Sequence, residues 1–153
     1  MFQTIDLFPT PLWIGEEINQ EKLKLLNDAS DSIIVDAIKS KQKEISDRNK
    51  IFGDIKDKGF TFHSKNLVNE TPFIELQHFI EQTSVDFLNS MGYDLKNYSV
   101  FITEMWVQEF AKQGGGHHTL HTHWNGHMSG FYFLKASEAT SLPLFEDPRP
   151  RGS

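Results

Sequence analysis

Apolar residues recur at helical spacing in two blocks of the N-terminal part of the chain. Within residues 19–45 they fall three or four positions apart among many Lys, Glu and Asp residues. This spacing predicts one or two amphipathic helices, with Asn19 as the residue that caps the first turn. The second block covers residues 71–92. Pro72 suits the first turn of a helix there, and Gly92 is a natural helix end.

The apolar period changes to two after Asn97, where β-branched and aromatic residues dominate. This change predicts strands rather than helices in the C-terminal part. We therefore expect one α+β domain over residues 1–153, with a mainly helical part at 1–96 and a β part at 97–153. The strands expected are 98–110, 117–124, 127–135 and 141–145, together with a short one at 60–62 in a loop region (46–69) and an edge strand at 8–14.

Composition narrows the class of protein and of partner. The chain has 153 residues, a formal net charge of −6 and no cysteine. The negative charge disfavours electrostatic binding to nucleic acid or anionic lipid. The sequence has neither a long apolar run nor a secretory signal, so we expect a cytoplasmic protein without a membrane segment. Without thiolates, any metal must be held by nitrogen and oxygen, which suits iron, manganese, zinc, nickel or copper. The oligomeric state stays open.

Five of the seven histidines lie between positions 117 and 127. Because side chains alternate along a strand, His121 and His123 would share one face, together with His117, and could bind one metal ion. His118 would point to the opposite face, and a solvated loop is the alternative for both His117 and His118. We expect His63 and His78 to be ordinary surface or core residues. A surface metal trap without a biological role is a further alternative.

The dipeptide Asn125-Gly126 predicts a two-residue hairpin turn, because both turn positions favour positive φ. Such a turn would pair Trp124 with His127. Directly opposed residues share a face, so His127 would point away from His121 and His123.

Several short motifs along the chain form a recognisable pattern: FPTPLW (8–13), Trp106, HTHWN (121–125), SGFYFL (129–134) and FEDPR (145–149). In these motifs the chain resembles the small 2-oxoglutarate- and Fe(II)-dependent oxygenases of marine phages and bacteria. The resemblance implies a double-stranded β-helix, or jelly roll, with helices outside one sheet, and a site where Fe(II) and 2-oxoglutarate support hydroxylation of a substrate that we cannot name.

The resemblance also implies roles for single residues. His121 matches the first iron ligand of the superfamily, and His123 occupies the position of the ligating acid. Tyr132, Trp106 and Asn125 are the positions expected to bind the cosubstrate, although a strand aromatic such as Tyr132 is also typical of a core.

Two elements of such a site are not found in the sequence, namely a distal histidine ligand and a basic residue that pairs with the far carboxylate of 2-oxoglutarate. Arg149 is a weak candidate for the second. We therefore expect an incomplete jelly roll: a fragment, a truncated product or a degenerate relative, inactive as given. The alternative function is a non-enzymatic, cupin-like metal-binding or structural protein.

Overall fold

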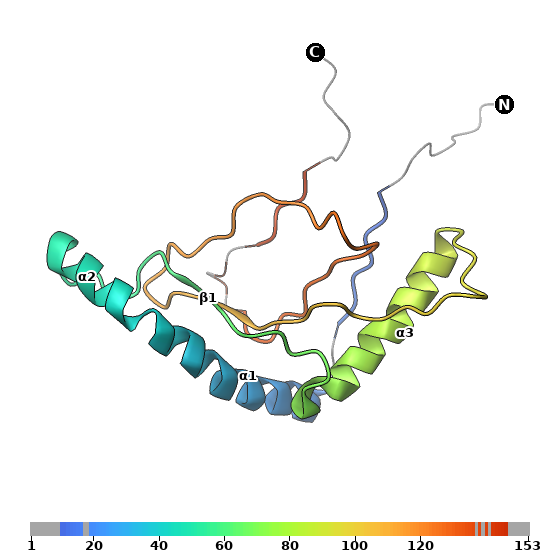
Figure 1. Cartoon of the computed structure of the whole chain (residues 1–153), viewed down its shortest axis with the longest axis horizontal. Helices are drawn as coiled ribbons and strands as arrows, with labels where there is room; N and C mark the ends of the chain where they lie inside the picture. Colours follow the sequence, from blue (N-terminus) through green and yellow to red (C-terminus); the bar gives the residue numbers. More distant parts are fainter. Residues whose placement is uncertain (1–9, 17–18, 137, 139, 141, 147–153) are drawn as a thin grey trace, which may run out of the picture.

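The computed structural model describes residues 10–16, 19–136, 138, 140 and 142–146, and it combines helices with a small antiparallel sheet. The helices lie along one side of the molecule as a curved row, and long extended segments of the C-terminal part cover the other side (Figure 1). The mixed class predicted from the sequence is confirmed. The elements are α1 (Gln20–Ser40), α2 (Gln42–Phe52), β1 (Thr61–His63), the 3₁₀ helix η1 (Thr71–Phe73), α3 (Ile74–Ser90) and β2 (Gln108–Phe110).

The helical predictions are confirmed for α1 and α3. The side chain of Asn19 accepts a hydrogen bond from the backbone N–H of Lys22 at 3.0 Å, so it caps α1 as predicted. Pro72 lies in η1, which leads into α3, and Gly92 follows α3 with a φ of 89°. None of the helices described has both the length and the apolar composition needed to cross a bilayer.

Helix α2 corrects one boundary, because it continues to Phe52 where we expected a loop from residue 46 onwards. Its buried face consists of Ile45 alone. Most polar side chains of α2 are exposed to solvent, while Arg48 and Asn49 are half-buried, so the low apolar content that suggested a loop is equally compatible with a helix that packs along one narrow edge. Gly53, with a φ of 83°, follows its last turn.

Strands β1 and β2 form a two-stranded ribbon whose inner face packs on α1. Phe62 pairs with Glu109, and its side chain is only 2% exposed. Val107, two residues before Glu109, packs against both of the clusters that form the core. The buried members are Ile34, Ile45, Phe60, Phe62 and Ala111 in one cluster and Leu26, Leu67, Phe73 and Leu76 in the other.

The expected strand 98–110 is wrong in length, since β2 covers only three residues. The chain before β2 still runs beside the residues after β1, but side chains replace part of the ladder. Ser64 Oγ accepts from the backbone N–H of Val107 at 3.0 Å, and Asn66 Oδ1 accepts from that of Met105 at 3.1 Å. Because these oxygens take the place of backbone carbonyls, regular pairing stops at β2.

The strands expected at 117–124 and 127–135 are also wrong, since both segments are irregular. The turn between these two segments forms one residue earlier than predicted, because the N–H of Gly126 donates a hydrogen bond to the carbonyl oxygen of His123 at 3.4 Å. Neither Asn125 nor Gly126 has a positive φ, so the predicted hairpin turn is absent. Residues 142–145 and 10–14 are likewise irregular, while residues 8, 9 and 141 of the two remaining predicted strands lie outside the described residues.

Candidate metal centre

The outer face of the ribbon supports the histidine-rich loop. Side chains alternate here, so Trp106 lies opposite the core residues Met105 and Val107, and it shares the outer face with His63. The hydroxyl of Thr61 in β1 donates to the carbonyl oxygen of His117 at 3.0 Å, which fixes the start of the loop to the ribbon. The ribbon thus contacts the loop at His117, through this hydrogen bond, and at His118, through the ring of His63.

His121 and His123 point toward each other from this loop. Their Nε2 atoms are 3.2 Å apart, and His121 Nδ1 lies 2.7 Å from the carbonyl oxygen of Thr119. A carbonyl can only accept, so Nδ1 carries the proton and Nε2 of His121 keeps its lone pair. Two imidazoles that bind one ion at about 2.1 Å have their nitrogens roughly 3.0–3.4 Å apart for octahedral or tetrahedral angles. The 3.2 Å contact is a hydrogen bond that Nε2 of His123 donates to Nε2 of His121, and the same separation lies within the range for two adjacent ligands of one metal ion.

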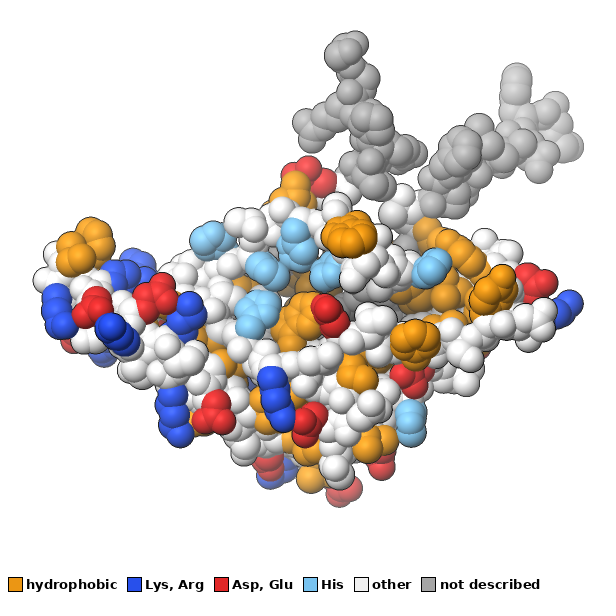
Figure 2. Space-filling model, viewed as in Figure 1, with side chains coloured by type: hydrophobic (Ala, Val, Ile, Leu, Met, Phe, Trp, Pro, Cys, Tyr) orange, Lys and Arg blue, Asp and Glu red, His pale blue; other side chains and the backbone are white. Residues whose placement is uncertain are grey.

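Three further rings complete a closed circuit of contacts around this pair. Centroid distances are 5.0 Å for His121–His123, 4.4 Å for His118–His121 and 5.3 Å for His63–His118. Trp106 closes the circuit, with its ring 6.0 Å from that of His63 and 6.3 Å from that of His123. Figure 2 shows several histidine side chains gathered on this face of the molecule, beside hydrophobic groups and an acidic one.

The circuit corrects one sequence expectation. His118 lies beside His121 instead of on the opposite face, because the loop is not a strand and its side chains do not alternate. His63 is an exposed residue, as expected, and its ring also contacts two members of the cluster. The pairing of β1 with β2 brings His63 to Trp106, and in this pairing His63 lies opposite Gln108, 45 positions further along the chain.

The protonation of two cluster members is shifted toward the neutral form. Burial lowers the pKa of His63, against the opposing effect of its hydrogen bond with the Gln108 side chain. Burial also lowers the pKa of His118, and the neighbouring imidazole of His121 adds to this effect. Both shifted histidines lie beside the pair His121 and His123 rather than in it, so the shifts favour neutral neighbours around the pair.

The structure separates the other predicted site residues. Trp106 belongs to the ring circuit, whereas the ring of Tyr132 packs against the core cluster around Leu67. Asn125 lies exposed in the turn that follows His123. His127 contacts the ring of Tyr93 at a centroid distance of 6.0 Å. Arg149, the weak candidate for a cosubstrate anchor, lies outside the described residues.

Within the described part of the chain, no three His, Asp or Glu side chains converge on one point. The candidate centre therefore consists of two protein ligands, His121 and His123. Water or the carboxylate and carbonyl oxygens of a small molecule would complete such a coordination shell.

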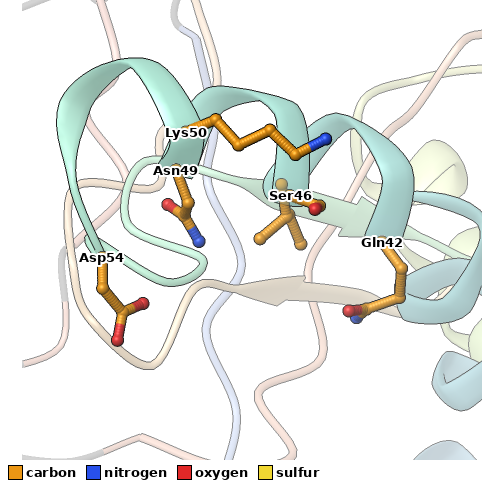
Figure 3. Close-up of a pocket in the computed structure, with 6 residues that line it drawn as sticks. Gln42, Ser46, Asn49, Lys50 and Asp54 are labelled. Atoms are coloured by element: carbon orange, nitrogen blue, oxygen red, sulfur yellow. The ribbon is translucent and has the colours of Figure 1, made fainter.

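A surface pocket of about 350 Å³ adjoins the histidine cluster and is lined by His63, Ser64, Asn66, Glu104 and Trp106. A second pocket, of about 470 Å³, lies along α2, where Figure 3 shows its polar side chains and Asp54, which follows the helix end. The second pocket contains no histidine, and its lining is Gln42, Ile45, Ser46, Asn49, Lys50 and Asp54.

Comparison with known proteins gives no family for this chain, because no family model, curated protein or solved structure matches it.

Proposed function

We propose that the chain binds a divalent transition metal through His121 and His123, and that it uses Fe(II) with 2-oxoglutarate as a dioxygenase that hydroxylates a small-molecule or protein substrate. The single observation that carries the metal site is the 3.2 Å separation of the two Nε2 atoms, together with the tautomer fixed by the Thr119 carbonyl. Iron and 2-oxoglutarate come from the resemblance of the residues around this pair to the oxygenase superfamily.

The fold belongs to the same proposal. An antiparallel ribbon backed by α1 is what one edge of a jelly-roll sheet with external helices would contain. Phe62 on the inner face of β1 is buried, whereas the neighbouring His63 on the outer face contacts Trp106, which is the alternation expected of a strand between a core and a site.

The chain's own residues would act by binding and positioning. The two imidazoles hold the metal, the Thr119 carbonyl keeps His121 in the ligating tautomer, and the indole of Trp106 supports the ring of His123. When bound, Fe(II) activates oxygen while 2-oxoglutarate is decarboxylated. Loop residues 117–123 are exposed, so the metal would be open to cosubstrate from solvent.

One observation favours the second candidate function, a non-enzymatic metal-binding protein. The loop that carries His121 and His123 has no regular secondary structure, and a metal ion shared by both would stabilise it. In this case metal removal loosens the loop or the fold. In an enzyme that merely loses its metal, the apo protein stays folded and only turnover stops.

Isothermal titration of the full chain with Fe(II) under anaerobic conditions, and with Zn(II), tests the metal site. We expect binding that falls at least tenfold in His121→Ala and in His123→Ala, since removing one of two ligands leaves a single imidazole. His78→Ala is the matched control, because His78 is exposed on α3. Equal affinities in all four proteins would refute the site.

Turnover is tested separately, by measuring succinate release from 2-oxoglutarate with Fe(II) and ascorbate. Release that disappears in His121→Ala supports the dioxygenase. Metal binding without succinate release, with or without candidate substrates, favours the non-enzymatic function. Circular dichroism before and after chelation then shows whether the metal supports the fold.

A further inference from the structure

The pocket beside the histidine cluster lies on the outer face of the ribbon. Its aromatic wall is Trp106, whose ring also contacts that of His123 at a centroid distance of 6.3 Å. A molecule in the pocket therefore lies one side chain away from the metal pair. Glu104, two positions before Trp106 in an extended segment, presents its carboxylate on the same side.

Two of the polar lining residues are already used for structural bonds. Ser64 Oγ donates to the carbonyl oxygen of Lys65 at 2.8 Å and accepts from Val107 N. Asn66 donates to the carbonyl oxygen of Thr103 at 3.3 Å, and its Oδ1 accepts from the N–H groups of Met105 and Val68. These two side chains shape the pocket but have little capacity left for a ligand.

The remaining groups define the charge of the pocket. None of the ion pairs among the described residues includes Glu104, and its carboxylate is exposed. No Lys or Arg lines the pocket, and burial favours the neutral form of His63 by lowering its pKa. A free carboxylate beside an indole face attracts cations, by ion pairing and by interaction with the aromatic ring.

We infer that this pocket binds a cationic group, a guanidinium or an ammonium, between the carboxylate of Glu104 and the indole of Trp106. The pocket volume of about 350 Å³ accommodates the end of an arginine or lysine side chain, or a small amine. The binding of a cation is independent of the function proposed above. Only the further step, that this cation is part of the molecule that is hydroxylated, rests on that function.

An NMR titration of the full chain, without added metal or 2-oxoglutarate, tests the inference. The probe is N-acetylarginine amide, and its neutral isostere N-acetylcitrulline amide is the ligand control. We expect the arginine compound to shift the indole N–H signal of Trp106, identified by its loss in Trp106→Phe. We also expect it to bind about fivefold or more tightly than the citrulline compound, as one exposed ion pair with a cation–π contact supports.

Glu104→Gln keeps the size of the side chain and removes its charge. It should lower the preference for arginine over citrulline to the part that the cation–π contact with Trp106 supplies, whereas Glu75→Gln, at an exposed position in the first turn of α3, should preserve the full preference. Equal binding of the two compounds to the unmodified protein would overturn the inference, as would an unchanged preference in Glu104→Gln. Tighter binding of an arginine-containing peptide than of agmatine would identify a protein substrate, and the reverse order a small amine.

The cation pocket and the metal site can be refuted independently of each other. The NMR titration uses metal-free protein, so loss of cation binding leaves the calorimetric result for His121 and His123 untouched. Conversely, a chain that does not bind iron can still show the preference for arginine.

Discussion

The chain before residue 112 and the chain after it differ in where they place large apolar side chains. All the buried hydrophobic residues lie between Leu26 and Ala111, and none of the described residues after Ala111 is buried. In the later part, Leu120 is 70% exposed and Trp124 is 89% exposed. The same kinds of residue therefore stabilise the first region and face solvent in the second.

This difference separates the roles of the two regions. Helices α1, α2 and α3 and the ribbon form the packed body, and the outer face of the ribbon contacts the loop of residues 117–123. Chemically reactive groups on loops over a rigid body are the usual arrangement of functional sites. The second region contributes Tyr132 and Leu134 to the rim of the core, and a hydrogen bond from Asn27 to the Leu134 carbonyl at 3.1 Å ties it to α1.

The largest expected effect on stability comes from truncating one side chain of the core, and it tests the difference between the two regions. Leu67 is 1% exposed, and Leu67→Ala should lower the free energy of unfolding by about 2–5 kcal/mol, because it leaves a cavity among Leu26, Phe73 and Leu76. Leu120→Ala removes the same atoms from an exposed position and should change it by less than about 0.5 kcal/mol. Urea denaturation measures both, and similar losses would contradict the division.

The helical region was predictable because its signals are local. The cap at Asn19, the proline in η1 and the glycine after α3 each act within one turn of chain, and each was found where the sequence placed it. Strands depend on distant partners. Residues 98–110 have the composition of a strand, but the side chains of Ser64 and Asn66 accept hydrogen bonds from backbone N–H groups of this segment. Nothing in the sequence of the segment itself indicates these side-chain partners.

The sequence indicated the histidine pair of the candidate site but not the residues that surround the pair. The spacing of His121 and His123 is visible in the sequence, although the structure brings them together in an irregular loop rather than on a strand. His63 and Glu104 come from other parts of the chain. Alternation with the buried Phe62 indicates that His63 faces outward, but only the pairing of β1 with β2 shows what it faces.

A smaller effect is expected at the junction of the two regions, where Gly116 packs directly on the ribbon. A Cβ at this position would lie 2.6 Å from the carbonyl oxygen of Phe60 and 3.0 Å from Phe110 Cδ1. Gly116→Ala should therefore push the loop away from the ribbon and cost about 1–3 kcal/mol of stability. Since His117 follows directly, the affinity of the His121–His123 pair for metal should fall as well.

Gly130→Ala is the matched control, because nothing lies within 4 Å of a Cβ built there. It should leave both the denaturation midpoint and the metal affinity close to those of the unmodified protein. Metal affinity that is unaffected by Gly116→Ala would show that the loop does not depend on its contact with the ribbon, and the two regions would then be independent.

The smallest effect concerns His63, which belongs to the ribbon and contacts His118 of the loop. Burial lowers its pKa below the ordinary value of 6.5, so the unfolded chain binds this proton more readily than the folded one. Stability should fall as the pH drops through about 6.5, and the loss should be smaller in His63→Gln than in the unmodified protein.

Urea midpoints at pH 7.5 and 5.5 measure this difference in stability, and His78→Gln, at an exposed position, is the control. Identical pH dependence in His63→Gln and the unmodified protein would mean that the folded protein does not lower the pKa of His63 in solution.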